Sequence, residues 1–459
     1  MTKHEGCRTK GIRMKTHSTH VNATTGTFGL RPAPSLRHTH FLIRRWLSVL
    51  ALLLFSVIPA SAAVVANPAV APSNLLDRFG GFIPIEREVA GFFRVEQVNG
   101  RWIFITPEGH GYLALGANHV GKFVQNQSAE LMKRFDGDRE KAGAALTQAI
   151  RDLGLNAGEA YAPYWPKRKT QMPWVANISY PYSGKSGKLQ WRYRTFQFDV
   201  FDPAWQPKLR THVLKQCREF ATDPFVLGVA FVDQPLWGRA RVEYFRNLPE
   251  SAPGRQRLRE HQQAGRSDEE FLALVADTLY AQLKAAVREG APHHLFFGER
   301  FVLRQPPDAV LRAVGKHVDV FCTQALIPSR HRPPEWQAFQ PDGWDHEYKL
   351  TGKPVLVIDW AAPFSLGEGF ESQHGRLKTE ADDAEDSAEW LSAALTHPGI
   401  VNVFRCQLVG THVNDHWFEG RAKRTYLRDD GTPFPIMAAR VSEANRAALE
   451  AAYEKAAGK

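Results

Sequence analysis

Eight short apolar runs, rich in β-branched and aromatic residues, recur along this chain, and helix-like segments separate most of them. Continuous apolar runs of this length suit strands that are buried on both faces, as in a parallel sheet. Eight such strands alternating with helices are the number that closes into a (β/α)₈ TIM barrel. We therefore predict this α/β fold over residues 111–459. The expected strands lie within 112–118, 155–161, 172–180, 225–233, 293–301, 318–326, 353–361 and 400–408.

Helical periodicity occupies several of the intervals between these runs. The clearest case is 269–289, where apolar residues recur every three or four positions. Asp383 is a candidate N-cap for a helix over 384–395, because aspartate accepts hydrogen bonds from a first helical turn. The other expected helices cover 141–153, 208–220, 309–315 and 441–456.

A small β-element is expected ahead of the barrel, in residues 63–110. Asn99-Gly100 stands between two β-like runs within residues 92–109. This dipeptide between alternating apolar residues is a strong signal for a two-residue hairpin turn. The preceding Val64–Pro72 is rich in alanine and proline and is typical of a linker.

Residues 1–62 have the composition of a secretory leader. They hold nine Lys and Arg residues against one Glu, so eight of the chain's ten net positive charges lie there. Arg44 and Arg45 precede the apolar stretch Trp46–Ile58, and Ala60-Ser61-Ala62 follows it. These are the basic, apolar and cleavage-site parts of a signal peptide, which we place at about 41–62. The protein is then secreted or periplasmic; the alternative is an uncleaved membrane anchor.

The remaining chain is nearly neutral, at about +2, and gives no support for a nucleic-acid partner. Cys217, Cys322 and Cys406 are far apart in sequence, so we expect neither a disulfide framework nor a metal site. Glycine-rich nucleotide-binding motifs and a GxSxG elbow are absent from the sequence. We therefore expect no cofactor, and no membrane contact after signal cleavage. The sequence does not indicate an oligomeric state.

Chemistry in a TIM barrel belongs at the C-terminal ends of the strands. In the expected register these ends carry carboxylates, amides, arginines and aromatic rings. The candidate catalytic groups are Asp359, Asp233 and Glu299. The candidate substrate-binding residues around them are Asn118, His119, Glu159, Trp165, Gln234, Trp237, Arg300, Gln324, Trp360 and Arg405.

Paired carboxylates beside aromatic rings are what glycoside cleavage needs. One carboxylic acid protonates the leaving oxygen, and the other carboxylate attacks the sugar or activates water. Each candidate also has a purely structural interpretation. Asp359 could cap a turn, Asp233 could cap a helix or pair with an arginine, and Glu299 could pair with its neighbour Arg300.

Several short motifs, in this order, resemble the β-agarase-like glycoside hydrolases of family 50. The similarity extends from about Phe92 to Ala444, and the order of the motifs is more specific than any one of them. The matching segments are Gly100-Arg101-Trp102, Pro107-Glu108-Gly109-His110, Leu115–His119, Asp199–Trp205, Asp223-Pro224-Phe225, Gly298–Phe301, Thr351–Val355 and Asp429–Pro433.

The resemblance implies a (β/α)₈ barrel that cleaves β-glycosidic bonds of galactose-containing polysaccharides with retention. It implies a Glu acid/base after an Asp-Asn pair on the fourth strand, and a Glu nucleophile on the seventh. This chain departs at both places. The acid/base position falls on Pro235 or Gln234, neither of which can donate a proton, and the seventh strand ends in Asp359, one methylene shorter.

Three interpretations remain open on the sequence alone. The first is an active hydrolase of agar-like polysaccharides in which Asp233 or Glu299 works opposite Asp359. The second is an inactive barrel that binds a polysaccharide or oligosaccharide. The third is an enzyme of another reaction class, because a fold does not fix a function.

Overall fold

The computed structural model describes residues 75–120, 129–158, 171–181, 198–325, 339, 341–360, 364–372, 375–410 and 422–458. They belong to one compact unit, Val64–Lys459. The predicted leader, Glu159 and Trp165 lie outside the described residues.

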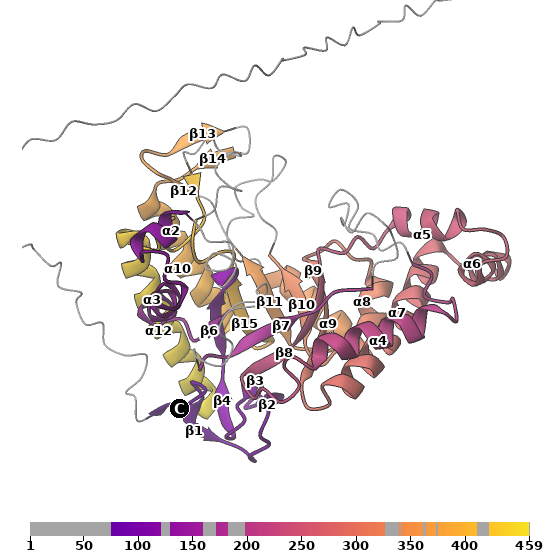
Figure 1. Ribbon diagram of the computed structural model, residues 1–459, viewed down its shortest axis with the longest axis horizontal. Coiled ribbons are helices and arrows are strands. Elements are labelled where there is room, and N and C mark those ends of the chain that lie inside the picture. The colour runs from indigo at the N-terminus through magenta and orange to yellow at the C-terminus, as the bar shows by residue number, and fades with distance from the viewer. Residues whose placement is uncertain are drawn as a thin grey trace, which may run out of the picture. The chain divides into compact units, whose positions relative to one another are not determined.

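Eight parallel strands close into a barrel, which confirms the predicted fold (Figure 1). The neighbours around the barrel run β10-β11-β15-β5-β6-β7-β8-β9, so strands adjacent in sequence are adjacent in space. Each strand lies within one of the eight predicted runs or overlaps it to within one residue. Their bounds are β5 (Ala114–Ala117), β6 (Ala157–Gly158), β7 (Trp174–Asn177), β8 (Val226–Asp233), β9 (Leu295–Val302), β10 (Phe321–Gln324), β11 (Val355–Trp360) and β15 (Ile400–Arg405).

The barrel interior is filled by side chains that alternate along the strands. Leu227, Phe297, Leu356 and Phe404 belong to one buried cluster drawn from four different strands. Two larger clusters contain the opposite faces of the strands together with the surrounding helices. A barrel strand is therefore buried on both faces, which is why its sequence is a continuous apolar run.

Helices cover the outside of the barrel. In Figure 1, α4 to α8 lie on one side of it, and α2, α3, α10 and α12 lie on the other. The bounds are α2 (Ala129–Arg134), α3 (Arg139–Asp152), α4 (Trp205–Cys217), α5 (Arg239–Arg246), α6 (Pro253–Gln263), α7 (Asp268–Gly290), α8 (Asp308–Gly315), α9 (Pro341–Thr351), α10 (Glu380–Thr396) and α12 (Pro435–Ala457). Among the described residues, no helix is both long enough and apolar enough to cross a membrane.

The predicted cap of α10 is wrong by one turn. Thr379 is the N-cap, and it forms a capping box with Asp382. Asp383 lies inside the helix, almost fully buried, where its carboxylate accepts a hydrogen bond from Arg405 at 3.1 Å. The pattern Thr-x-x-Asp competed with the aspartate as a start signal, and the threonine hydroxyl has the better geometry here.

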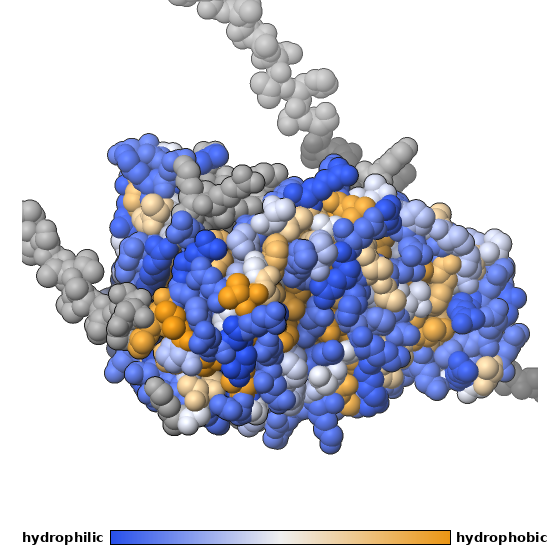
Figure 2. Space-filling view, turned by 90° about the horizontal axis from the view of Figure 1, so that it is seen from below, coloured by the Kyte–Doolittle hydropathy of each residue, from blue (hydrophilic) through white to orange (hydrophobic). Residues whose placement is uncertain are grey.

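A four-stranded antiparallel sheet precedes the barrel, as expected, in the order β1 (Phe82–Glu86), β4 (His110–Tyr112), β3 (Arg101–Ile105) and β2 (Arg94–Val98). Asn99 and Gly100 form the β2–β3 turn, with φ of 48° and 80°, as a type I′ turn requires. The Trp102 amide donates to the Pro398 carbonyl, just before β15. The sheet therefore lies at the N-terminal ends of the strands, and this end of the molecule is mostly hydrophilic (Figure 2).

Two short antiparallel pairs follow β11 at the opposite end of the barrel (Figure 1). β12 (Phe364–Ser365) pairs with β16 (Ala422–Lys423), and β13 (Phe370–Ser372) pairs with β14 (Gly375–Leu377). These segments stand over the C-terminal ends of the strands, where a barrel builds its active site.

Candidate active site

Asp359 owes its orientation to an irregularity near the end of β11. The pairing of β11 with β15 shifts register between Val357 and Trp360. Ile358 belongs to the interior cluster, and Trp360 packs outward on Trp390 of α10, with ring centroids 4.5 Å apart. An extra residue in a strand re-aims the side chains next to it, and here Asp359 is left facing the charged groups inside the barrel mouth.

The Asp359 carboxyl is only 5% exposed and lies among charged groups. Burial raises its pKa to about 6; Arg424 and Arg300 oppose the shift, and the like charge of Asp233 adds to it. The Cys406 thiol contributes a hydrogen bond that also lowers this pKa. One carboxylate oxygen, Oδ1, is buried without a hydrogen-bond partner in the part of the chain that the structure describes.

Asp233, at the end of β8, is held by groups from the next two strands. The Gln324 side-chain amide donates to Asp233 Oδ1, and the Arg300 guanidinium lies 3.9 Å from the same oxygen. The side-chain amide of Gln234 in turn donates to Gln324 Oε1 at 3.1 Å. The predicted residues Asp233, Gln234, Arg300 and Gln324 therefore form one network, and the charge of Asp233 reaches Asp359.

Asn118 follows β5 and sits beside the same strand end as Asp359. Its side-chain amide donates to the carbonyl of Ile358, and its own backbone N–H donates to Arg405 O at 2.9 Å. Its side-chain oxygen is buried without a partner among the described residues. His119, the next residue, has a positive φ of 62°, which ends the strand direction.

Glu299 does not join this network. Gly298 before it has a φ of +73°, and the carboxylate is fully buried among the side chains of α7 and the segments after β7 and β8. It accepts hydrogen bonds from Tyr180 at 2.9 Å, Trp237 at 3.0 Å and Tyr280 at 3.2 Å. Burial raises its pKa, and Arg241 opposes this. The expectation that Glu299 faces Asp359 is not met.

Three further predicted residues face the helices instead of the mouth. Trp237 and Trp360 are each 5% exposed and belong to the outer clusters, so they offer no open ring face to a sugar. Arg405 extends toward α10, where it donates to Ser387 Oγ at 2.9 Å and to Asp383. Trp360 and Arg405 pair across the register shift between β11 and β15, so alternation in the sequence could not tell the inner face from the outer one there. Trp237 lies four residues beyond β8, where the alternation of a strand no longer applies.

Two residues near the mouth, Arg424 and Cys406, are not among the predicted site residues. Arg424 is the first opposing charge on Asp359, yet it lies beyond the last strand, in a segment with no motif. The sequence indicates for Cys406 only that a disulfide framework and a metal site are not expected. Its position directly after Arg405 becomes a signal only once the outward direction of Arg405 is known, because neighbouring residues of a strand point to opposite faces.

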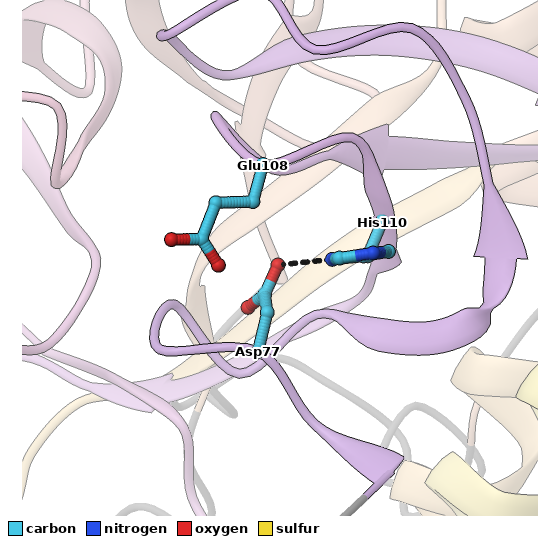
Figure 3. A group of neighbouring side chains, drawn as sticks. All are labelled: Asp77, Glu108 and His110. Atoms are coloured by element: carbon cyan, nitrogen blue, oxygen red, sulfur yellow. Dashed lines mark hydrogen bonds and ion pairs between the residues drawn. The ribbon is translucent and has the colours of Figure 1, made fainter.

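A possible metal cluster lies in the N-terminal sheet, away from the strand ends. Ligand atoms of Asp77, Glu108 and His110 lie within 4.8 Å of one another (Figure 3). Both Asp77 oxygens are already occupied: Oδ1 accepts from two backbone N–H groups of the following turn, and Oδ2 contacts Thr106 and His110. Glu108 pairs with Arg78 at 2.8 Å. The cluster is a hydrogen-bonded turn, and its donor set does not resemble a closed metal site.

A surface hollow of about 900 Å³ also lies apart from the candidate residues. Its walls come from α3, α12 and the segment 76–80, with Met172 and Leu427 between them. The exposed arginines along its edge include Arg134 and Arg151. Its position on the outside of the barrel separates it from the carboxylates at the strand ends.

Comparison with known proteins places the fold among agarase structures. No family model matches the sequence, and no curated protein sequence matches it significantly. The structure is similar to that of an exo-β-agarase, with a TM-score of 0.68 and 16% identity over 86% of this chain and 70% of that one. It is similar to the agarase AgWH50C, with a TM-score of 0.66 and 16% identity over 83% and 66% of the two chains. It is also similar to BpGH50, with a TM-score of 0.60 and 15% identity over 83% of this chain and 87% of that one.

At 15–16% identity these similarities show the fold alone, which is a TIM barrel that resembles those of the family 50 agarase structures. The chain spans about two thirds of the length of the first two agarases. Counting from β5, the fourth strand is β8 and the seventh is β11. Asp233 is therefore the last residue of the fourth strand, and Asp359 is the last but one of the seventh.

Proposed function

We propose that this protein hydrolyses β-glycosidic bonds in an agar-like, galactose-containing polysaccharide, with Asp233 and Asp359 as its two carboxylates. The observation that supports this most is that the acids at the ends of the fourth and seventh strands surround one arginine: Arg300 lies 3.9 Å from Asp233 and also acts on the charge of Asp359. Two carboxyl groups across one site are the requirement for glycoside hydrolysis. The similarity to agarases suggests the substrate class.

The two carboxyl groups have different surroundings, as an acid and a base need. Asp233 accepts from an amide and lies beside a guanidinium, with a fifth of its side chain exposed. Asp359 is almost fully buried, and burial raises its pKa to about 6, which suits a group that carries a proton. The environment thus favours Asp359 as the acid and Asp233 as the nucleophile or base, the reverse of the order that the resemblance implies.

Reducing-sugar release tests the proposal on agar, porphyran, carrageenan and β-galactan, with the mature chain and three variants. We expect Asp359→Asn and Asp233→Asn each to lower kcat by at least about 10³-fold. Asp383→Asn is the matched control, since Asp383 is equally buried and its pKa is also raised to about 6, but it pairs with Arg405 outside the barrel. It is expected to keep kcat.

A non-catalytic polysaccharide-binding barrel is the second candidate function. It is favoured by the contacts of Asp233 with Gln324 and Arg300, because these contacts already occupy a carboxylate oxygen that a catalytic group would present to substrate or water. If no glycan of the panel is hydrolysed but one binds, and Asp359→Asn binds it equally well, the binding function replaces the hydrolase.

Secretion or export to the periplasm is part of the same proposal. A polysaccharide too large to enter a cell must be met outside it, and the leader supports this location. N-terminal sequencing of the protein recovered from the medium or periplasm is expected to begin just after Ala62. A full-length chain retained in the membrane fraction would contradict it.

A further inference from the structure

Glu299 is a buried acid that the proposed reaction does not use. Its carboxylate meets three side-chain donors: Tyr180 at Oε1, and Trp237 and Tyr280 at Oε2. Arg241 adds an opposite charge nearby. Burying a carboxylate costs free energy unless it is paired and hydrogen-bonded. The four groups around Glu299 meet this cost, and the same bonds restrain the position of each partner.

The donors come from segments that follow different strands. Tyr180 lies three residues after β7, Trp237 lies four residues after β8, and Tyr280 belongs to helix α7. Glu299 itself lies near the end of β9. One carboxylate therefore ties the exits of two neighbouring strands to the helix layer.

The segment after β8 is the one that carries candidate chemistry. Asp233 ends β8, and Gln234 follows with a positive φ of 49° and a backbone N–H that donates to Arg300 O at 2.9 Å. Beyond it, Arg241 Nε donates to Leu236 O at 3.2 Å, and the Arg241 guanidinium lies 3.7 Å from the centre of the Trp237 ring. The connection of residues 234–238 is thus held at both ends.

We propose that Glu299 is a positioning residue: by holding Trp237 and Arg241, it fixes the connection of residues 234–238 and with it the orientation of Asp233. This inference rests on the proposed function, because it assumes that Asp233 takes part in the reaction. Positioning matters for such a group, since a displacement of about 1 Å costs roughly 10²-fold in rate.

Two variants separate positioning from mere structural support. Trp237→Phe keeps an aromatic ring under Arg241 but removes the donor that links Glu299 to the 234–238 connection. Tyr280→Phe removes a donor to the same Oε2 atom, and also the group that accepts from the Glu299 backbone N–H at 3.1 Å, but it lies on α7. The control variant therefore loses at least as many hydrogen bonds as the test variant.

Kinetics and hydrogen exchange are measured on the mature chain and both variants. We expect kcat of Trp237→Phe to fall roughly tenfold with KM nearly unchanged, while Tyr280→Phe keeps kcat within about twofold despite a lower Tm. We expect faster amide exchange in peptides covering residues 230–240 for Trp237→Phe only. Equal exchange in the two variants, or faster exchange in Trp237→Phe with kcat unchanged, would overturn the positioning role.

The exchange measurement keeps the two proposals distinguishable. If the wild-type chain hydrolyses no glycan, the proposed function is contradicted, and so is the claim that Glu299 orients Asp233 for catalysis. The anchoring of residues 234–238 by Glu299 is then still decided by exchange alone. If the wild-type chain is active and both variants lose kcat in proportion to their loss of Tm, the proposed hydrolase function is retained and the positioning role is excluded.

Discussion

At the scale of single residues, the mouth of the barrel is a balance of charges around Asp359. Arg424 and Arg300 favour its ionised form, while burial and Asp233 favour the proton. The Cys406 thiol donates a hydrogen bond that also favours the ionised form. A thiol is a weak donor, so its contribution is small beside that of the two arginines, but it is the easiest of them to remove cleanly.

Replacing Cys406 should change the pKa of Asp359 without displacing the backbone. Cys406→Ala removes the thiol donor, so the pKa of Asp359 rises above about 6. The limb of the pH–rate profile that belongs to Asp359 therefore shifts to higher pH, whereas Cys406→Ser, whose hydroxyl still donates, does not shift it to higher pH. If the basic limb moves, Asp359 is the acid; if the acidic limb moves, it works ionised. Identical profiles for both variants and wild type would exclude the thiol contact.

The same carboxyl should make the folded protein less stable at neutral pH. Its folded pKa of about 6 lies above the ordinary value of 3.8, so the folded state binds the proton more tightly. Stability then falls as pH rises from about 4 to 6 and stays lower above that window. Asp359→Asn removes this penalty, and we expect it to raise the free energy of unfolding at pH 8 by up to ~3 kcal/mol, with no gain at pH 3.5. Urea denaturation at the two pH values measures this, and a variant less stable at both would contradict it.

At the scale of elements, the strands could be predicted from sequence but the direction of several side chains could not. The runs that hold Leu227, Phe297 and Leu356 are apolar on both faces, so composition alone identified them as barrel strands. The shifts in β11 and β9 changed which residues face inward, and that depends on pairing with neighbouring strands. Asp359 and Arg300 were thus placed at the mouth as expected, while Trp360 and Glu299 were not.

Gly298 is the position where the β9 chain direction is most demanding. Its φ of +73° is in the left-handed region, and an added Cβ would lie 2.6 Å from a Tyr280 ring carbon. We expect Gly298→Ala to lower the free energy of unfolding by about 3 kcal/mol, from backbone strain and from displacement of Tyr280. Gly352→Ala is the control, because φ is +63° there and nothing lies within 4 Å, so about 1 kcal/mol is expected. Equal losses in urea denaturation would show that the Tyr280 contact carries no weight.

At the scale of the whole molecule, the N-terminal sheet covers the N-terminal ends of the strands and leaves the C-terminal ends for chemistry. The small β-element and the barrel could be predicted, because the hairpin signal at Asn99-Gly100 and the alternation of strands and helices are local patterns. The end of the barrel that the sheet covers could not be predicted, because it depends on packing between distant segments. The partnership of Asp233 with Asp359 could only be suspected. They are 126 positions apart in the sequence, and their interaction depends on closure of the barrel.

The central claim is that Asp233 and Asp359 act as one catalytic pair, and a double-mutant cycle on kcat tests it most directly. Asp233→Asn, Asp359→Asn and the double variant are compared on the best substrate of the panel, with Asp383→Asn as the control. Groups that act as a unit are strongly non-additive, so the double variant should be no slower than the slower single variant, within about threefold. Effects that multiply, or a single variant that keeps wild-type kcat, would contradict the account.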